Sequence, residues 1–158
     1  MPGTEIRPAR PEELETVAGL RWRWVAERDG PPPGVERDRF VREFAAWARQ
    51  HAATHRCLVL VRDGAVIGMG FLALTPRVPA PYTFTRASGD VQCVYVVPEA
   101  RDTGLGGRLI QGLLDLAAEL GLERVTVHSS SRAVAAYQRH GFAVSPCLLQ
   151  TVLLPPAR

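Results

Sequence analysis

The spacing of apolar and polar residues changes along the chain, and this change predicts a mixed order of helices and strands. A helical period of apolar positions extends over residues 11–26 and again over residues 35–51. Two apolar runs within residues 57–74 flank Asp63-Gly64, a dipeptide that favours a hairpin turn because both of its positions tolerate positive φ. We therefore expect a short strand at residues 4–7, two helices and then a β-hairpin.

The second half of the chain continues with strands and helices in alternation. Residues 75–89 contain three prolines and no clear period, so we expect a loop or a ragged strand extension there. The remaining pattern predicts a strand, a helix, a strand, a helix and two closing strands, at residues 90–97, 105–120, 123–128, 132–140, 142–144 and 148–154. This order predicts one α/β or α+β domain over residues 1–158, with a partly antiparallel sheet and helices on both faces.

Composition is that of a globular protein. Hydrophobic residues make up 46% of the chain and charged residues 22%, and no apolar run approaches the roughly 18 residues of a membrane span. The first fifteen residues carry charge and proline where a secretory signal needs an apolar core. We therefore expect no membrane association and a cytoplasmic location.

Charge and cysteine usage narrow the choice of ligand. The net charge is +3, and every one of the 19 Lys and Arg positions is arginine. This balance suits an anionic ligand, but the arginines are scattered and form no run, so nucleic-acid binding is not expected. Cys57, Cys93 and Cys147 lie far apart in apolar runs and lack metal-ligand spacing, so we expect buried small hydrophobes and no metal.

A glycine-rich turn between the strand at 90–97 and the helix at 105–120 carries the clearest chemical signal. It has the form Arg-x-x-Gly-x-Gly from Arg101 to Gly106. Backbone N–H groups at such a helix start point at one spot, and the helix dipole makes that spot favour an anion such as a phosphate. A dinucleotide fingerprint needs a third glycine where Leu109 stands, and a P-loop needs a lysine, which the chain lacks.

Two segments resemble one known family. Residues 96–108, VVPEARDTGLGGR, are similar to the acyl-CoA-binding motif of the GCN5-related N-acetyltransferase (GNAT) superfamily, whose pattern is Gln/Arg-x-x-Gly-x-Gly/Ala after a central strand. Residues 124–142 are similar to the family's second signature, a strand and then a helix ending in Tyr-x-x-x-Gly-Phe, here Tyr137 to Phe142. The resemblance implies a GNAT fold, in which a mixed, largely antiparallel sheet of about six to seven strands splays between strands 4 and 5 and is flanked by about four helices.

The resemblance also implies a binding site for acetyl-CoA, which the family holds between the two splayed strands. Its pantetheine arm is expected to bond to the main chain at Val94 and Val96. Its pyrophosphate is expected to lie on backbone N–H groups of Arg101, Asp102, Thr103, Gly104, Leu105, Gly106 and Gly107. Glycine suits positions 104 and 106 because a Cβ there would hold the phosphate away. Where many members carry an asparagine, this chain has three serines, of which Ser130 is expected to contact the pantetheine or CoA.

Catalytic roles follow from the same resemblance. Tyr137 matches the tyrosine that protonates the leaving thiolate, the alternative being an aromatic residue that only packs the helix on the sheet. Asp90, eleven residues before Arg101, aligns with a strand glutamate that acts as general base in some members, the alternative being a turn residue. His128 is a second candidate for the base, because histidine side chains titrate near neutral pH.

These features predict an N-acetyltransferase that transfers the acetyl group of acetyl-CoA to a primary amine of a small molecule or peptide, by direct attack in a ternary complex. The alternative is a non-catalytic acyl-CoA-binding or sensing module, and the presence of Tyr137 favours the enzyme. The sequence does not identify the amine or the acyl-chain preference, and a homodimer is one option for the assembly.

Overall fold

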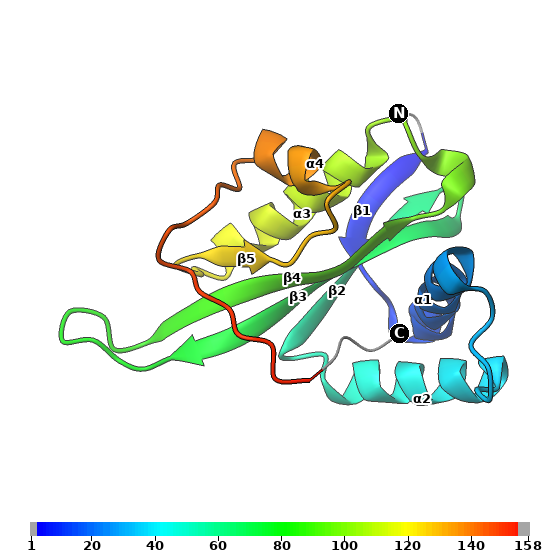
Figure 1. Ribbon diagram of the computed structural model, residues 1–158, viewed down its shortest axis with the longest axis horizontal. Helices are drawn as coiled ribbons and strands as arrows, with labels where there is room; N and C mark the ends of the chain where they lie inside the picture. The colour runs from blue at the N-terminus through cyan, green and yellow to red at the C-terminus, as the bar shows by residue number, and fades with distance from the viewer. Residues whose placement is uncertain (1–2, 155–158) are drawn as a thin grey trace.

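The computed structural model describes residues 3–154, which build one mixed sheet with helices on both of its faces (Figure 1). The strands lie in the order β1-β2-β3-β4-β5; the first three neighbouring pairs are antiparallel, and β4 and β5 are parallel. The strand bounds are β1 Thr4–Pro8, β2 His55–Arg62, β3 Ala65–Arg77, β4 Arg86–Val96 and β5 Val125–Val127.

Four α-helices cover the sheet, as the resemblance implied. Helices α3 and α4 lie on one face, and α1 and α2 lie on the other (Figure 1). The helix bounds are α1 Leu14–Asp29, α2 Arg37–Gln50, α3 Leu105–Glu119 and α4 Val134–Arg139, with 3-10 turns at Pro11–Glu13 and Pro98–Ala100. Within residues 3–154, no helix combines the length and the apolar character that crossing a membrane requires.

The core fills both sides of the sheet. Along α3, a stripe of apolar side chains is buried at Leu105, Leu109, Leu113 and Ala117, whereas Leu116 is half-buried and Leu120 is exposed. On the opposite face, Phe44 of α2 packs edge-on against Phe71 of β3, with ring centroids 6.1 Å apart. A Cβ on Gly70 would lie 2.8 Å from Leu113 Cδ1, so the absence of a side chain there lets α3 approach β3 closely.

The predicted β-hairpin at Asp63-Gly64 is confirmed, with φ of 51° and 79° at the two turn positions. Residues 75–89 are a strand extension at both ends and a loop between them, because β3 continues to Arg77 and β4 begins at Arg86. The two strands form a long hairpin that projects from the body of the molecule (Figure 1). As a result Asp90 lies inside β4, paired with Ala73 and Thr126, and its alternative role as a turn residue is wrong.

The two closing strands predicted at residues 142–144 and 148–154 are absent, so within residues 3–154 the sheet has five strands where about six to seven were expected. The apolar, β-branched composition of this segment favours a strand, but a strand also needs a neighbour to complete its backbone hydrogen bonds. In the described chain, residues 142–154 have no such neighbour and run along the outside of the molecule (Figure 1).

The prediction of three buried cysteines is correct only in part. Cys57 and Cys93 are half-buried, whereas Cys147 lies in the C-terminal segment and is exposed. Burial raises the pKa of the Cys57 thiol to about 12, and it also raises the pKa of the Cys93 thiol. Neither thiol is therefore a ready nucleophile.

Candidate active site

An opening between β4 and β5 is the central feature of the site. The two parallel strands pair at only three positions, from Gly89 with Val125 to Val91 with Val127. Beyond this point β4 continues to Val96, while β5 has already ended. A bulge at Cys93, where φ is +56°, shifts the register of β4 against β3 and bends the strand at the same level. One side of β4 from Gln92 onward therefore has no strand beside it within the described residues.

At its far end, β4 leads through a short turn into the N-terminus of α3. Gly104 has φ of +79° and its carbonyl oxygen accepts the first helical hydrogen bond, from Arg108 N at 3.2 Å. Asp102 also has a positive φ, of 61°. A Cβ added to Gly104 or Gly106 would meet no atom within 4 Å, so the space in front of the helix start is open. This geometry suits an anion bound by backbone N–H groups.

We call the backbone N–H groups expected to bind the pyrophosphate, those of residues 101–107, the cradle. The side chains of Leu105 and Thr103 are engaged elsewhere, and Gly107 lies close to a side chain that follows α4. The Leu105 side chain is buried in the core, leaving only its backbone at the turn. The Thr103 hydroxyl donates to the carbonyl of Ala100 at 2.8 Å, which fixes the turn. A Cβ on Gly107 would lie 2.8 Å from His140 Nε2, so glycine at this position lets α4 pack closely against α3.

Arg101 points away from the helix start. Its Nε donates to the Val96 carbonyl at 2.9 Å, and its Nη2 donates to Glu27 Oε2 on α1 at 3.1 Å. The guanidinium also lies 5.2 Å from the centre of the Tyr95 ring, a cation–π distance. Only the backbone of Arg101 thus remains for an anion, and the Val96 carbonyl, expected to bond to pantetheine, already accepts a hydrogen bond.

Glu27 is a residue that the sequence reasoning did not connect with the cradle. It accepts hydrogen bonds from the Tyr95 hydroxyl and from Arg101, and so ties α1 to the end of β4. Burial opposes ionisation of this carboxyl group, but the bonds from Tyr95 and Arg101 outweigh it and lower the pKa of Glu27. Burial and the hydrogen bond to Glu27 raise the pKa of Tyr95 to about 12, so its hydroxyl stays protonated.

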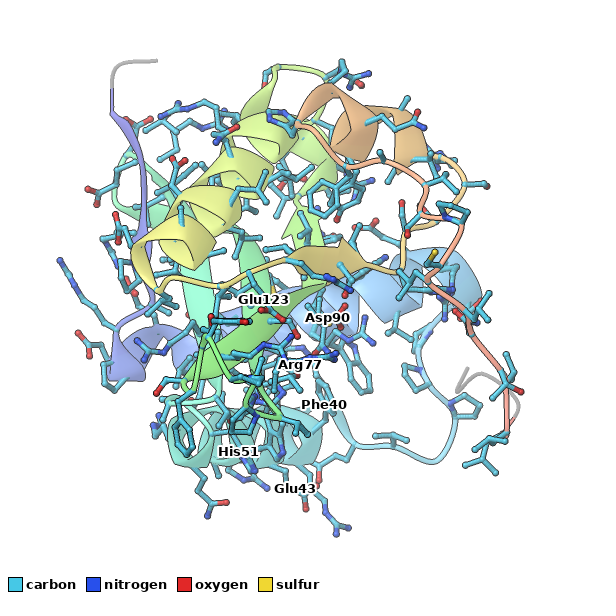
Figure 2. The ribbon with its side chains drawn as sticks, turned by 90° about the vertical axis from the view of Figure 1, so that its left-hand side faces the viewer. Phe40, Glu43, His51, Arg77, Asp90 and Glu123 are labelled. Atoms are coloured by element: carbon cyan, nitrogen blue, oxygen red, sulfur yellow. The ribbon has the colours of Figure 1, made fainter. Side chains whose placement is uncertain are left out.

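Asp90 faces the side of the sheet that α1 and α2 cover. Its neighbour Gly89 faces the opposite side, because a Cβ there would lie 2.8 Å from Leu122 Cδ1, just after α3. Both carboxylate oxygens of Asp90 are held: Oδ1 accepts from Thr126 Oγ1 at 2.8 Å, and Oδ2 accepts from Gln92 Nε2 at 2.9 Å. Figure 2 shows Asp90 at the level of β5, with Phe40 of α2 below it.

Tyr137 lies on α4, on the other face of the sheet, and lines a groove together with residues of β5. The side chain is only 7% exposed, and its ring packs edge-on against Phe142 with centroids 5.3 Å apart. It belongs to the same buried cluster as Val96, with Cys93 and Val94 packed against that cluster. Burial raises the pKa of Tyr137, which keeps its hydroxyl protonated over a wider pH range. The packing role and the proton-donor role are compatible.

His128 and Ser130 follow β5 and are both exposed. His128 lines a groove of about 640 Å³ together with Tyr137, Val134 and Phe142. No hydroxyl of Ser129, Ser130 or Ser131 caps α4, which begins at Val134 after the N-cap residue Ala133 and not at residue 132. Ser129 Oγ instead donates to the Ser130 carbonyl at 2.7 Å.

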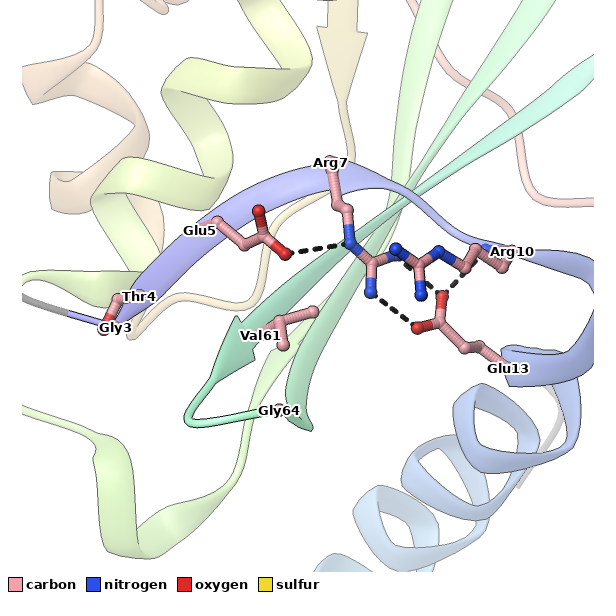
Figure 3. A pocket seen from close by; sticks show the side chains of 8 residues that line it. All are labelled: Gly3, Thr4, Glu5, Arg7, Arg10, Glu13, Val61 and Gly64. Carbon is pink, nitrogen blue, oxygen red and sulfur yellow. Dashed lines mark hydrogen bonds and ion pairs between the residues drawn. The ribbon is translucent and has the colours of Figure 1, made fainter.

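A second hollow, of about 400 Å³, lies at the opposite edge of the sheet, between β1 and the start of α1 (Figure 3). Arg7 donates to Glu13 at 2.7 and 2.9 Å and to Glu5 at 3.0 Å. The hydrogen bonds from Arg7 hold the pKa of Glu13 at about 2, so this cluster is a structural ion pair. Within residues 3–154, no group of three or more His, Cys, Asp or Glu side chains is arranged to hold a metal ion.

Curated proteins of related sequence are N-acetyltransferases. A glucosamine 6-phosphate N-acetyltransferase from Trypanosoma brucei brucei is 32% identical over 82 residues, which are 50% of this chain and 52% of that protein. The chain thus matches about half the length of the trypanosomal relative. The uncharacterized N-acetyltransferase YhfO from Bacillus subtilis (strain 168) is 26% identical over 120 residues, which are 72% of this chain and 76% of that protein.

Other proteins of known structure share this fold. A crystal structure of a predicted acetyltransferase with acetyl-CoA from Clostridium acetobutylicum superimposes with a TM-score of 0.76 and 17% identity, over 95% of this chain and 96% of that one. This likeness shows a shared fold. The family model of the acetyltransferase (GNAT) family matches residues 20–142, which is more than half of the chain. The protein therefore belongs to the GNAT family of acetyltransferases.

Proposed function

We propose that the protein is an acetyl-CoA-dependent N-acetyltransferase that acts on a primary amine of a small molecule or peptide. The observation that carries the proposal is the opening between β4 and β5, which leads from Asp90 to the start of α3. Membership of the GNAT family supports it, as do the curated relatives that are named N-acetyltransferases.

The opening fits acetyl-CoA at both ends. A pantetheine arm is an extended chain with amide groups, and the free side of β4 from Gln92 to Val96 is an extended main chain without a neighbouring strand. The pyrophosphate then reaches the open space before α3, where side chains on Gly104 and Gly106 would fill its place. In this assignment Val94 and the N–H of Val96 bond to pantetheine, and the cradle comprises backbone groups of residues 101–107.

Asp90 and Tyr137 supply the two proton transfers. Bound acetyl-CoA supplies a thioester whose carbonyl carbon the amine attacks, forming the C–N bond as the C–S bond breaks. Asp90 takes the proton that the amine must lose, directly or through a water molecule, on the side of the sheet below α1 and α2. Tyr137 donates its hydroxyl proton to the leaving sulfur from the opposite side.

The proposal is tested by ligand-dependent stability and by thiol release. Acetyl-CoA and CoA at about 100 times Kd are expected to stabilise the protein by about 2.7 kcal/mol, and NAD to have no effect. Acetyl-CoA should then release free CoA in the presence of one member of an amine panel containing glucosamine 6-phosphate, a polyamine, an amino acid and a peptide. Preference for NAD would contradict the cradle, and CoA binding without thiol release would favour a non-catalytic module.

Substitution at Asp90 and at His128 separates the two candidates for the base. Asp90→Asn keeps the hydrogen bond from Thr126 but cannot take a proton, so we expect kcat to fall about 100-fold at pH 7 with the Kd for acetyl-CoA unchanged. His128→Gln, on an exposed residue, is expected to change kcat by less than about threefold. Steady-state kinetics of both variants distinguish the two candidates. A large fall in kcat for His128→Gln with little change for Asp90→Asn would assign the base to His128.

A further inference from the structure

A pocket of about 470 Å³ lies at one end of the sheet, where β1 ends and β2 begins. Leu14 at the start of α1, Ala48 near the end of α2 and Leu116 of α3 contribute to its walls. Its volume is within the roughly 300–1,000 Å³ that small-molecule sites occupy. The pocket shares no residue with the proposed acetyl-CoA site between β4 and β5, and it belongs to the other edge of the sheet. It is therefore a separate candidate site.

Apolar side chains line the interior of this pocket because two hydrophobic clusters flank it. Leu14 and Ala48 belong to a small cluster formed by α1 and α2, and Leu58 of β2 belongs to the main core. All three side chains are buried, and Leu116 packs against the main core from α3. The protein's own side chains leave the space between these walls unfilled. An apolar group that enters it is removed from water, which favours binding.

Two arginines supply positive charge at the exposed rim of the pocket. Arg49 Nη2 donates to the Pro11 carbonyl at 3.2 Å, and Arg56 Nε donates to the Ala53 carbonyl at 3.1 Å. These bonds hold each guanidinium and leave its other N–H groups for a ligand. Within residues 3–154, neither guanidinium forms an ion pair, and no Asp or Glu side chain lines the pocket. Apolar walls below two such cations are complementary to a carboxylate that carries an apolar chain.

We propose that this pocket binds a small monocarboxylic acid with an apolar chain. The carboxylate lies at the rim, where Arg49 and Arg56 neutralise its charge. The chain lies between Leu14, Leu58 and Leu116. Arginine suits the rim because its planar guanidinium can donate two parallel hydrogen bonds to one carboxylate. The complex is reversible, and its formation requires no acetyl transfer.

The test measures binding of octanoate to the full chain by isothermal titration and locates the ligand by NMR. Octanoate is expected to bind with a submillimolar Kd and to give nuclear Overhauser contacts to the methyl groups of Leu14, Leu58 and Leu116. From butanoate to octanoate, each added CH2 should lower the Kd about fourfold, which is the effect of burying one CH2 group. An absence of octanoate binding in the millimolar range would overturn the proposal, as would contacts to other methyl groups instead.

Two further probes separate the charge from the chain. 1-Octanol has the same chain without a charge, and octylamine reverses the charge, so both should bind at least about 10-fold more weakly than octanoate. Octylamine that binds as tightly as octanoate would overturn the role of the arginines. These titrations contain no acetyl-CoA and no amine acceptor for acetyl transfer. A failure of the acetyltransferase proposal and a failure of this pocket are therefore seen in separate measurements.

Variants at the rim identify the contact. Arg49→Met and Arg56→Met remove the charge from exposed side chains and keep an unbranched chain, and each should raise the Kd for octanoate at least about 10-fold. Arg42→Met is the matched control, because Arg42 is an exposed arginine of α2 that does not line the pocket, and it should leave the Kd unchanged. Ala52→Phe, at an exposed lining position, should fill the pocket and abolish binding while the circular dichroism stays that of the wild type. An unchanged Kd in both rim variants, or in Ala52→Phe, would overturn the proposal.

Discussion

Gly106→Val is expected to raise the Kd for acetyl-CoA about 100-fold or more while leaving the fold intact. An added Cβ at this position meets no protein atom within 4 Å, so the larger side chain has room in the free protein. Valine is also a better helix former than glycine, and Gly106 lies in the first turn of α3. The added bulk instead occupies the open space before α3 that we propose for the pyrophosphate. Charge-assisted hydrogen bonds are worth about 1.5–3 kcal/mol each, so losing two of them accounts for the effect.

Ala118→Val is the matched control for this variant. It places the same β-branched residue at an exposed position near the other end of α3, and it should change neither the Kd nor the thermal midpoint appreciably. Isothermal titration with acetyl-CoA and thermal unfolding measure the two properties in parallel. Unchanged affinity in Gly106→Val would refute the cradle. Gly104→Val is a less clean probe, because Gly104 has φ of +79° and any side chain there strains the backbone.

Elements whose pattern is local were predictable from the sequence. The α3 stripe and the Asp63-Gly64 turn depend on residues a few positions apart, so the sequence alone carries the signal. The closing strands were not predictable in the same way. Residues 148–154 have the composition of a strand, but strand formation depends on a partner edge that composition does not reveal. Residues 75–89 form the expected strand extension and loop, with Pro76 inside β3 and the other two prolines in the loop.

In the candidate site, too, local motifs were predictable from the sequence and contacts between distant residues were not. The glycines of the cradle form a contiguous motif, and the structure keeps open space in front of Gly104 and Gly106. The partner of Arg101 was not predictable, because Glu27 is 74 positions away and no periodicity connects them. The motif assigned only the backbone N–H of Arg101 to the ligand, and the structure adds that its side chain binds α1. Gly107 was assigned to the cradle by its backbone N–H, and the close approach of His140 is a second constraint on this position that the motif does not reveal.

The network around Glu27 connects α1 directly to the end of β4 and the turn that precedes α3. Arg101 bridges the Val96 carbonyl and Glu27, and Tyr95 donates to the same carboxylate. Because these bonds join the helix that covers the amine side to the turn that precedes the cradle, they hold both halves of the proposed ternary complex in one arrangement. Catalysis by direct transfer depends on such positioning, since the amine and the thioester must meet at a fixed distance.

Tyr137→Phe is expected to lower kcat about 100- to 1,000-fold with little change in the Kd for acetyl-CoA. The phenyl ring preserves the edge-on contact with Phe142 and the burial of the side chain, so the fold and the opening between β4 and β5 should be unchanged. In the proposed mechanism the variant lacks the proton donor for the leaving sulfur, and general acids typically contribute about 10²–10⁴ in rate. Single-turnover thiol release, measured beside the binding titration, separates the chemical step from binding.

The pH profile distinguishes a proton donor from a packing residue. A general acid must be protonated to act, so its contribution is present below its pKa and is lost as the pH rises through it. Because burial raises the pKa of Tyr137, the wild-type rate should hold to the alkaline end of the accessible range. Tyr82→Phe, which removes the hydroxyl of a fully exposed tyrosine on the β3–β4 hairpin, is the matched control and should leave kcat unchanged. An undiminished kcat in Tyr137→Phe would show that Tyr137 only packs against Phe142. Water would then be the proton donor for the thiolate.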